Sequence, residues 1–266
     1  MNLIKIFLAF SLFSVAFSLE NFNSHLLPRP LILEYAETVR ADSEEFEKEV
    51  HLQCTSWRFA AETNNLSPWK TIPPECADYV KDYMTTRAYS IDLERVSKEA
   101  AVYARSVELG GDGKDVWVFD VDETLLSNLP YYASHGFGLE VFDGVEFDKW
   151  AEKAMAPAIQ ASLRLYEEVS SLGFKAILLT GRHEQQREAT VENLMKAGFR
   201  NWDKLILRAS GDVEKQATIY KSEKRSEMVE EGYRILGNSG DQWSDLLGSP
   251  VSVRSFKLPN PMYYIP

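Results

Sequence analysis

Two aspartates follow a short apolar run near the middle of the chain, in the segment VWVFDVDET at residues 116–124. The run from Val116 to Phe119 is β-branched and aromatic without polar alternation, which is typical of a buried strand in a parallel sheet. Asp120 and Asp122 would then lie at the carboxyl end of a core strand, where open α/β sheets bind their ligands. Buried carboxylates are rare unless they are paired. The pattern predicts a site in which one carboxylate attacks a phosphoryl group and ligates a cation, while the other handles a proton.

An Asp-x-Asp pair alone is equally typical of a surface turn or of a simple Mg²⁺ or Ca²⁺ site, so the other strand ends must decide. A second apolar run ends at Thr180, Lys221 stands at the start of a predicted helix, and a further strand precedes Asp241 and Asp245. All strands of a parallel sheet end at the same edge. These side chains would therefore converge although they are far apart in the sequence.

Apolar runs and helical patterns alternate from Asp115 onward, which predicts an α/β fold with a doubly wound parallel sheet. An aromatic flap is expected above the first strand end, at residues 128–138, and the other insertions are too short for a large cap. The predicted strands cover residues 116–119, 174–179, 202–208, 233–238 and 252–258, and the predicted helices cover 147–154, 158–172, 184–197 and 222–231.

The N-terminus has the features of a secretory signal peptide at residues 1–18. Lys5 precedes an apolar run, and Ala16 and Ser18 are small residues at the −3 and −1 positions of a cleavage site. The run is short for a membrane span, and an uncleaved signal anchor is the alternative. We therefore expect a protein that is secreted or delivered to the vacuole, without membrane attachment once the signal is cleaved.

The rest of the chain is expected to divide into a helical extension at residues 19–110 and a core at residues 111–266. Within the extension, the sequence predicts an acidic helix at about residues 34–50, a loop-rich segment at 51–76 and a pair of amphipathic helices between 79 and 109.

Two cysteines, Cys54 and Cys76, delimit most of the loop-rich segment. In an oxidising compartment an even number of cysteines favours a disulfide, which would stabilise the chain by about 3 kcal/mol on the chain-entropy model. Two free buried thiols are the alternative. Asn65 begins the only glycosylation sequon, inside the same segment, although Pro68 directly after Ser67 disfavours its use.

The composition is that of an ordinary globular protein, with 266 residues, 45% hydrophobic and 26% charged. The net charge of −11 argues against a nucleic acid as partner, because the chain has no basic surplus to displace counterions. A phosphate site on such an acidic chain must create its positive field locally, from a metal, a lysine and backbone amides.

The polar motifs together resemble those of the haloacid dehalogenase superfamily of phosphohydrolases: DxDxT, a strand ending in Thr, a Lys at a helix start, and GDxxxD. Over nearly the whole mature chain the sequence is similar to the plant class B-like acid phosphatases and their relatives, the vegetative storage proteins. This resemblance implies a Rossmann-like sheet of the haloacid dehalogenase type. It is carried by VWVFDVDETLLSNLPYY at 116–132, LLTGR at 178–182, YKS at 220–222, GNSGDQWSDLL at 237–247 and FKLPNPMYY at 256–264.

The resemblance implies a role for each catalytic residue. Asp120 would be the nucleophile that forms an aspartyl-phosphate. Asp122 would be the general acid and then the general base, and its protonation at the first step implies an optimum on the acid side of neutral. Thr180 and Gly181 would bind the phosphoryl oxygens, and Lys221 would neutralise charge on Asp120 and on the phosphate.

The resemblance also implies Mg²⁺ as the cofactor. The ion would be held by Asp120, the backbone carbonyl of Asp122, and Asp241, with Asp245 one shell out or replacing a water. Oxygen ligands with retained waters suit this ion.

Two assignments stay open. Lys224 or Lys215 could take the part of Lys221, although the position of Lys221 at a helix start favours the latter. Arg182 either binds substrate or braces its loop.

The resemblance implies an acid phosphatase that acts on a small phosphorylated substrate, with a homodimer expected from exposed aromatic residues on the N-terminal helices. The alternative is a vegetative storage protein with weak or vestigial activity. Loss of the nucleophile would favour storage, and Asp120 is present.

Overall fold

The computed structural model describes residues 43–266. The predicted signal peptide at 1–18 and the start of the predicted acidic helix lie outside the described residues. Within the described part, no helix combines the length and the apolar character needed to cross a membrane.

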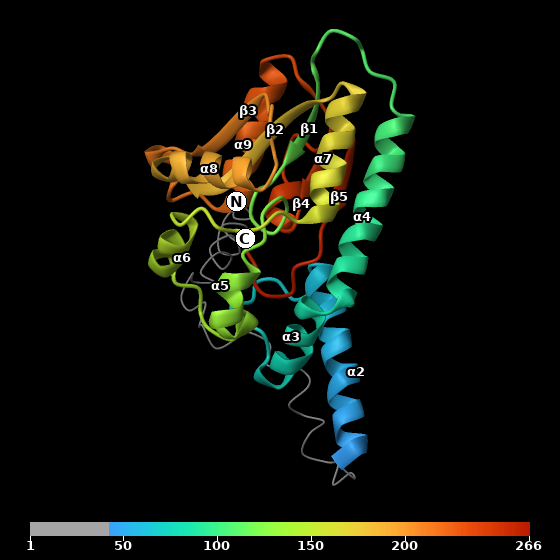
Figure 1. Cartoon of the computed structure of the whole chain (residues 1–266), viewed down its shortest axis with the longest axis vertical. Helices are drawn as coiled ribbons and strands as arrows, with labels where there is room; N and C mark the ends of the chain where they lie inside the picture. The colour runs from blue at the N-terminus through green and yellow to red at the C-terminus, as the bar shows by residue number, and fades with distance from the viewer. Residues whose placement is uncertain (1–42) are drawn as a thin grey trace, which may run out of the picture. The chain divides into compact units, whose positions relative to one another are not determined.

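The sheet has five parallel strands in the order β3-β2-β1-β4-β5 (Figure 1). Phe119, the last residue of the central strand β1, is level with Leu178 on β2 and with Ser239 on β4. The predicted α/β fold with a parallel sheet is confirmed, and the carboxyl ends of β2, β1 and β4 lie side by side. The strands are β1 (Asp115–Phe119), β2 (Lys175–His183), β3 (Lys204–Arg208), β4 (Arg234–Gly240) and β5 (Arg254–Lys257).

The helices lie near their predicted places in the core, with shifted ends. The helix predicted at 184–197 is a 3₁₀ turn followed by α8, and the one predicted at 222–231 begins at Ala217. The helices are α2 (Ser43–Glu62), α3 (Ala77–Thr85), α4 (Arg87–Ser106), α5 (Leu129–Ser134), α6 (Gly144–Ala151), α7 (Gln160–Leu172), α8 (Arg187–Lys196), α9 (Ala217–Glu230) and α10 (Trp243–Leu246), with 3₁₀ helices at Pro74–Cys76, Gly136–Gly138, Glu184–Gln186 and Ser210–Asp212.

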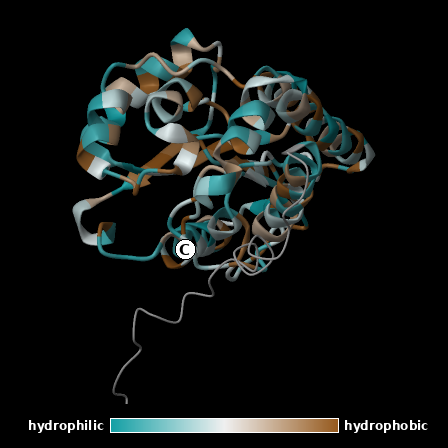
Figure 2. Cartoon of the chain, turned by 90° about the horizontal axis from the view of Figure 1, so that it is seen from below, coloured by the Kyte–Doolittle hydropathy of each residue, from teal (hydrophilic) through white to brown (hydrophobic). Residues whose placement is uncertain are grey.

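Both faces of β1 are covered, which explains why this strand has no polar alternation. Trp117 points into the larger core cluster, which includes residues of α4 and α7, whereas Val116 packs with Tyr220 of α9 on the other face. Figure 2 shows the hydrophobic strands in the interior, between helices that carry many of the hydrophilic residues. This burial on both sides fixes the end of β1, where the candidate site begins.

The prediction of a loop-rich segment at 51–76 is wrong for residues 51–62, because α2 continues to Glu62. Cys54, Trp57 and Ala61 are buried at helical spacing, so packing of this face stabilises the longer helix. The disulfide between Cys54 and Cys76 is confirmed and ties α2 to the start of α3. The two helices predicted between residues 79 and 109 are confirmed as α3 and α4.

Asp115, at the start of β1, should stabilise the fold in a pH-dependent way. Its buried carboxylate accepts bonds from Arg234 Nε and from the backbone N–H of Gly110, both at 2.6 Å. The bond from Arg234 lowers the pKa of Asp115 below its ordinary value. We expect Asp115→Asn to lower the free energy of unfolding by about 1–3 kcal/mol at neutral pH, measured by urea denaturation.

The pKa of Asp115 is lowered in the folded state, so its contribution is present above the pKa of the unfolded chain and is lost as the pH falls through the folded value. The difference from wild type should therefore shrink below about pH 4. Asp112→Asn is the matched control, because Asp112 pairs with the same Arg234 at the exposed surface, where ion pairs contribute little. Equal effects of the two substitutions would contradict this prediction.

Candidate active site

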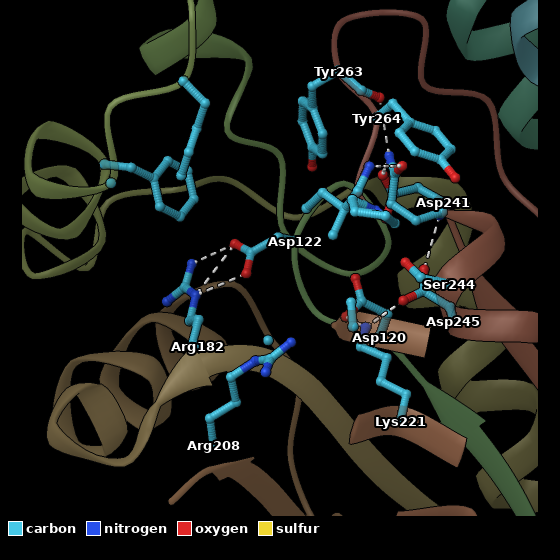
Figure 3. Close-up of a pocket in the computed structure, with 18 of the residues that line it drawn as sticks. Asp120, Asp122, Arg182, Arg208, Lys221, Asp241, Ser244, Asp245, Tyr263 and Tyr264 are labelled. Carbon is cyan, nitrogen blue, oxygen red and sulfur yellow. Dashed lines mark hydrogen bonds and ion pairs between the residues drawn. The ribbon is translucent and has the colours of Figure 1, made fainter. Parts of the chain in front are cut away.

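A cavity of about 430 Å³ opens at the carboxyl edge of the sheet (Figure 3). Its lining includes most of the residues that the sequence analysis assigned to the site. Thr180 is the exception, because its side chain is fully buried and does not line the cavity. The predicted residues that do line it are Asp120, Asp122, Gly181, Lys221, Asp241 and Asp245.

Lys221 lies between two carboxylates at the end of β1. Its Nζ donates to Asp120 Oδ1 at 2.6 Å and to Asp245 Oδ1. Burial would lower the pKa of Lys221, but the charges of Asp120 and Asp245 outweigh it and raise this pKa, so the amine stays protonated. The alternative lysines, Lys215 and Lys224, pair with acidic residues of α9 and with Asp212, in the 3₁₀ helix before it.

The carboxylates of Asp120, Asp241 and Asp245 form a buried cluster, with one oxygen of each within 4.8 Å of the others. Burial raises the pKa of Asp120 well above its ordinary value, and burial together with the charge of Asp245 raises the pKa of Asp241 to about 7. One lysine does not balance three buried carboxylates, so the cluster suits a cation. Gly240 permits this approach, because a Cβ there would lie 2.4 Å from Asp245 Oδ2.

Asp245 has both carboxylate oxygens engaged with the protein. Oδ1 accepts from Lys221, and Oδ2 accepts from the backbone N–H of Gln242 at 2.8 Å. This arrangement suits a position one shell away from a bound ion better than direct ligation.

Asp122 is turned toward Arg182 (Figure 3). Arg182 Nη2 donates to Asp122 Oδ1 at 2.7 Å, Arg182 Nε donates to Oδ2 at 3.0 Å, and Asn128 Nδ2 donates to Oδ1 at 2.8 Å. Burial would raise the pKa of Asp122, but Arg182 outweighs it and holds this pKa below its ordinary value. The carboxylate is therefore ionised at neutral pH, whereas the expected acid step needs it protonated.

Arg182 is itself buried and also donates from Nη1 to Thr190 Oγ1, on α8, at 3.2 Å. Arg182 also lines the cavity, and its contacts within the protein fit bracing of Asp122 and not of its own loop. Thr180 lies two residues before Arg182, inside β2, and its Oγ1 accepts the backbone N–H of Arg182 at 3.2 Å.

The expected aromatic flap is largely the short helix α5, and its tyrosines are packed. Tyr132 lines the cavity and stacks on Tyr263, with ring centroids 4.9 Å apart. Tyr263 in turn donates its hydroxyl to Glu123, whose pKa is raised to about 8 by burial and by the charge of Asp122. The residues from Tyr263 to Pro266 also line the cavity, so the C-terminal tail forms one of its walls.

The sequence analysis missed several further polar residues at the site, among them Arg208, Gln242 and Asn260. Arg208, at the end of β3, lines the cavity, and its Nη1 donates to the backbone carbonyls of Asp212 and Lys215. Gln242 and Asn260 both donate to Asp241. The strand end at Arg208 was a usable signal, whereas nothing in the sequence links Asn260 to the cluster.

The fold is similar to that of solved acid phosphatases. The class C acid phosphatase from Bacillus anthracis matches with a TM-score of 0.57 at 23% sequence identity, over 70% of this chain and 83% of that chain. At this identity the likeness concerns the fold alone.

Sequence comparison identifies much nearer relatives. "Acid phosphatase 1" of Solanum lycopersicum is 65% identical over 98% of this chain and 99% of its own. "Stem 28 kDa glycoprotein" of Glycine max is 44% identical over 80% of this chain and 84% of its own, and "Vegetative storage protein 2" of Arabidopsis thaliana is 41% identical over 81% and 82%. The model of the HAD superfamily, subfamily IIIB (acid phosphatase), matches residues 41–266. The chain therefore belongs to subfamily IIIB of the HAD superfamily, the acid phosphatases.

Proposed function

We propose that this protein is a secreted or vacuolar, Mg²⁺-dependent acid phosphatase that hydrolyses small phosphomonoesters through an aspartyl-phosphate on Asp120. The observation that carries the proposal is the position of Asp120, 2.6 Å from Lys221 Nζ and within a buried carboxylate cluster at the floor of an open cavity. Family membership and the relative named acid phosphatase support it. The disulfide supports passage through the secretory pathway.

In the first step, a carboxylate oxygen of Asp120 attacks phosphorus and the bond to the leaving oxygen breaks. That oxygen takes its proton from Asp122 and departs as an alcohol. Because Arg182 holds the pKa of Asp122 low, this step requires acid pH. In the second step, Asp122 takes a proton from water, whose oxygen attacks phosphorus. The bond between phosphorus and the Asp120 oxygen breaks, which releases inorganic phosphate and restores the Asp120 carboxylate.

Lys221 balances the negative charge that Asp120 and the phosphoryl group bring together, and Gly181, which lines the cavity, contacts the phosphoryl oxygens. Thr180, which was expected to share this contact, does not line the cavity and accepts the backbone N–H of Arg182 instead.

Asp120, the backbone carbonyl of Asp122, and Asp241 would hold Mg²⁺, with Asp245 behind them. When bound, the ion supplies charge stabilisation for the phosphoryl oxygens. The cluster of oxygen ligands, paired with Lys221, supports a divalent cation at this place.

The proposal is tested by hydrolysis of an aryl phosphate from about pH 4 to about pH 8, with Mg²⁺ and with a chelator. We expect activity on the acid side of neutral that falls at least about ten-fold when the metal is removed and returns when Mg²⁺ is added. Chelator-resistant activity would contradict the metal assignment.

A storage role is the second candidate, because relatives named stem glycoproteins and vegetative storage proteins are 41–44% identical to this chain. Absence of hydrolysis at every pH and metal concentration would favour storage over catalysis.

Two further proposals concern partners and modification. Phe46, Leu52 and Phe59 are exposed on α2, which supports a homodimer that sedimentation would detect. Asn65 is exposed after α2, which supports its glycosylation.

Arg182→Gln should impair the proton step more than phosphoryl transfer itself, because it removes the group that orients Asp122. An alkyl phosphate needs a proton on its leaving oxygen, whereas a nitrophenyl phosphate does not. We therefore expect kcat/KM to fall about 10- to 100-fold more for the alkyl ester than for the nitrophenyl ester.

Arg187→Gln is the matched control, since Arg187 pairs with the exposed Glu184. Arg187→Gln should leave kcat/KM for both esters within about two-fold of wild type. An equal loss for the two esters in Arg182→Gln would argue that Arg182 acts on the phosphoryl group instead.

A further inference from the structure

Asp241 is held by two side-chain amides on the same oxygen. Asn260 Nδ2 donates to Asp241 Oδ2 at 2.7 Å, and Gln242 Nε2 donates to the same atom at 2.8 Å. All three residues are buried. With Oδ2 engaged in this way, Oδ1 is the oxygen left for a cation, and it lies 3.5 Å from Thr124 Oγ1.

Asn260 is fixed from two sides. Its Oδ1 accepts the backbone N–H of Met262 at 3.0 Å, so its amide nitrogen must be the atom that faces Asp241. Its own backbone N–H donates to Glu62 Oε1 at 2.8 Å. Asn260 lies beyond β5, in a tail without helix or strand, so such bonds determine where its side chain lies.

Glu62 is the last residue of α2, and it holds several parts of the site at once. Its Oε2 accepts from Lys257 Nζ at 2.9 Å, and its backbone carbonyl accepts from Trp243 Nε1 at 2.9 Å. Lys257 ends β5, and Trp243 begins α10, directly after Asp241 and Gln242. The end of α2 therefore contacts both the tail, at Asn260, and α10, which begins two residues after Asp241.

We propose that Asn260 is a positioning residue for the metal ligand Asp241 and that Glu62 keeps Asn260 in place, so that helix α2 completes the metal site. This inference rests on the metal site of the proposed function. Outer partners that donate to a ligating carboxylate fix its orientation, and their loss typically weakens metal binding by about 10- to 100-fold. Helix α2 comes before the first strand in the sequence, with α3 and α4 between them. It nevertheless contributes to the metal site at the carboxyl edge of the sheet.

The test measures binding of Mg²⁺ and of Mn²⁺ to the full chain by isothermal titration calorimetry, without substrate. Asn260→Ala should raise the Kd of both ions by about 10- to 100-fold. Asn260→Asp keeps the size and the acceptor for Met262 but removes the donor to Asp241, and it should weaken binding at least as much. At saturating metal, hydrolysis of an aryl phosphate by Asn260→Ala should recover to within about three-fold of wild type.

The role of Glu62 is tested by comparing single and double substitutions. Glu62→Ala should also weaken metal binding, whereas Glu62→Gln retains an oxygen acceptor for Asn260 and should bind within about three-fold of wild type. Because Glu62 acts through Asn260, the double variant Glu62→Ala with Asn260→Ala should be no weaker than Asn260→Ala alone.

An unchanged Kd in both Asn260 variants would overturn the inference, and so would full additivity of the Glu62 and Asn260 effects. Wild-type protein that binds neither ion would overturn the metal site of the proposed function itself. Wild-type binding with unaffected variants would overturn the positioning role alone.

Discussion

Asp120→Asn should lower kcat for aryl phosphate hydrolysis by at least ~10⁴-fold, because an amide of the same size cannot attack phosphorus. The substitution keeps the shape of a side chain that lies 2.6 Å from Lys221 Nζ, so the loss should be chemical and not structural. Burial raises the pKa of Asp120, which means that its charge costs stability in the fold. We therefore expect the variant to be at least as stable as wild type in thermal unfolding.

A covalent intermediate gives this prediction a second readout. Wild type quenched in acid during turnover should carry one added phosphate by intact mass, whereas Asp120→Asn should carry none. Asp148→Asn is the matched control, because Asp148 lines the same cavity and bonds to Gln186 Nε2 at 3.0 Å. The kcat of Asp148→Asn should stay within about three-fold of wild type. Activity of Asp120→Asn within ten-fold of wild type would remove Asp120 from the role of nucleophile.

The central part of the fold could be predicted from the sequence because burial and strand direction constrain it strongly. A strand covered on both faces is expected to be largely apolar, and β1 is apolar from Val116 to Phe119. Parallel strands must end at one edge, so the convergence of Asp120, Lys221, Asp241 and Asp245 follows from topology without any knowledge of side-chain conformation.

The extent of α2 could not be predicted in the same way. The buried face of Cys54, Trp57 and Ala61 stabilises the helix as far as Glu62, whereas the prolines that favour a loop, at positions 68, 73 and 74, all lie beyond its end. Local preference is a weak predictor where tertiary contacts decide the end of a helix.

The sequence analysis missed some contacts around the site. These contacts depend on side-chain conformation and join residues that are far apart in the sequence. Arg182 was a candidate for the substrate or for its loop, yet its guanidinium pairs with Asp122, on a different strand end. Asn260 reaches Asp241 from an irregular tail. Neither contact has a sequence period, so no pattern along the chain could have indicated it.

Lys221→Met should lower kcat/KM by about 10²- to 10³-fold, because it removes an ammonium group that contacts both Asp120 and Asp245. Methionine has a similar length and leaves two buried carboxylates facing each other and the incoming phosphate. The inhibition constant of inorganic phosphate, a competitive inhibitor, should rise by the same factor. The charge of Lys221 acts on the phosphoryl group and not on the leaving group.

Lys224→Met provides the comparison on the same helix, because Lys224 pairs with Asp212 and Glu227 away from the carboxylate cluster. Lys224→Met should leave kcat/KM and the inhibition constant of inorganic phosphate within about two-fold of wild type. Lys221→Arg keeps the charge but spreads it over a wider planar group, so its activity should lie between wild type and Lys221→Met. If Lys221→Met and Lys224→Met lost activity equally, the positive charge at this site would have to come from elsewhere. Arg208, which also lines the cavity, would then be the residue to substitute next.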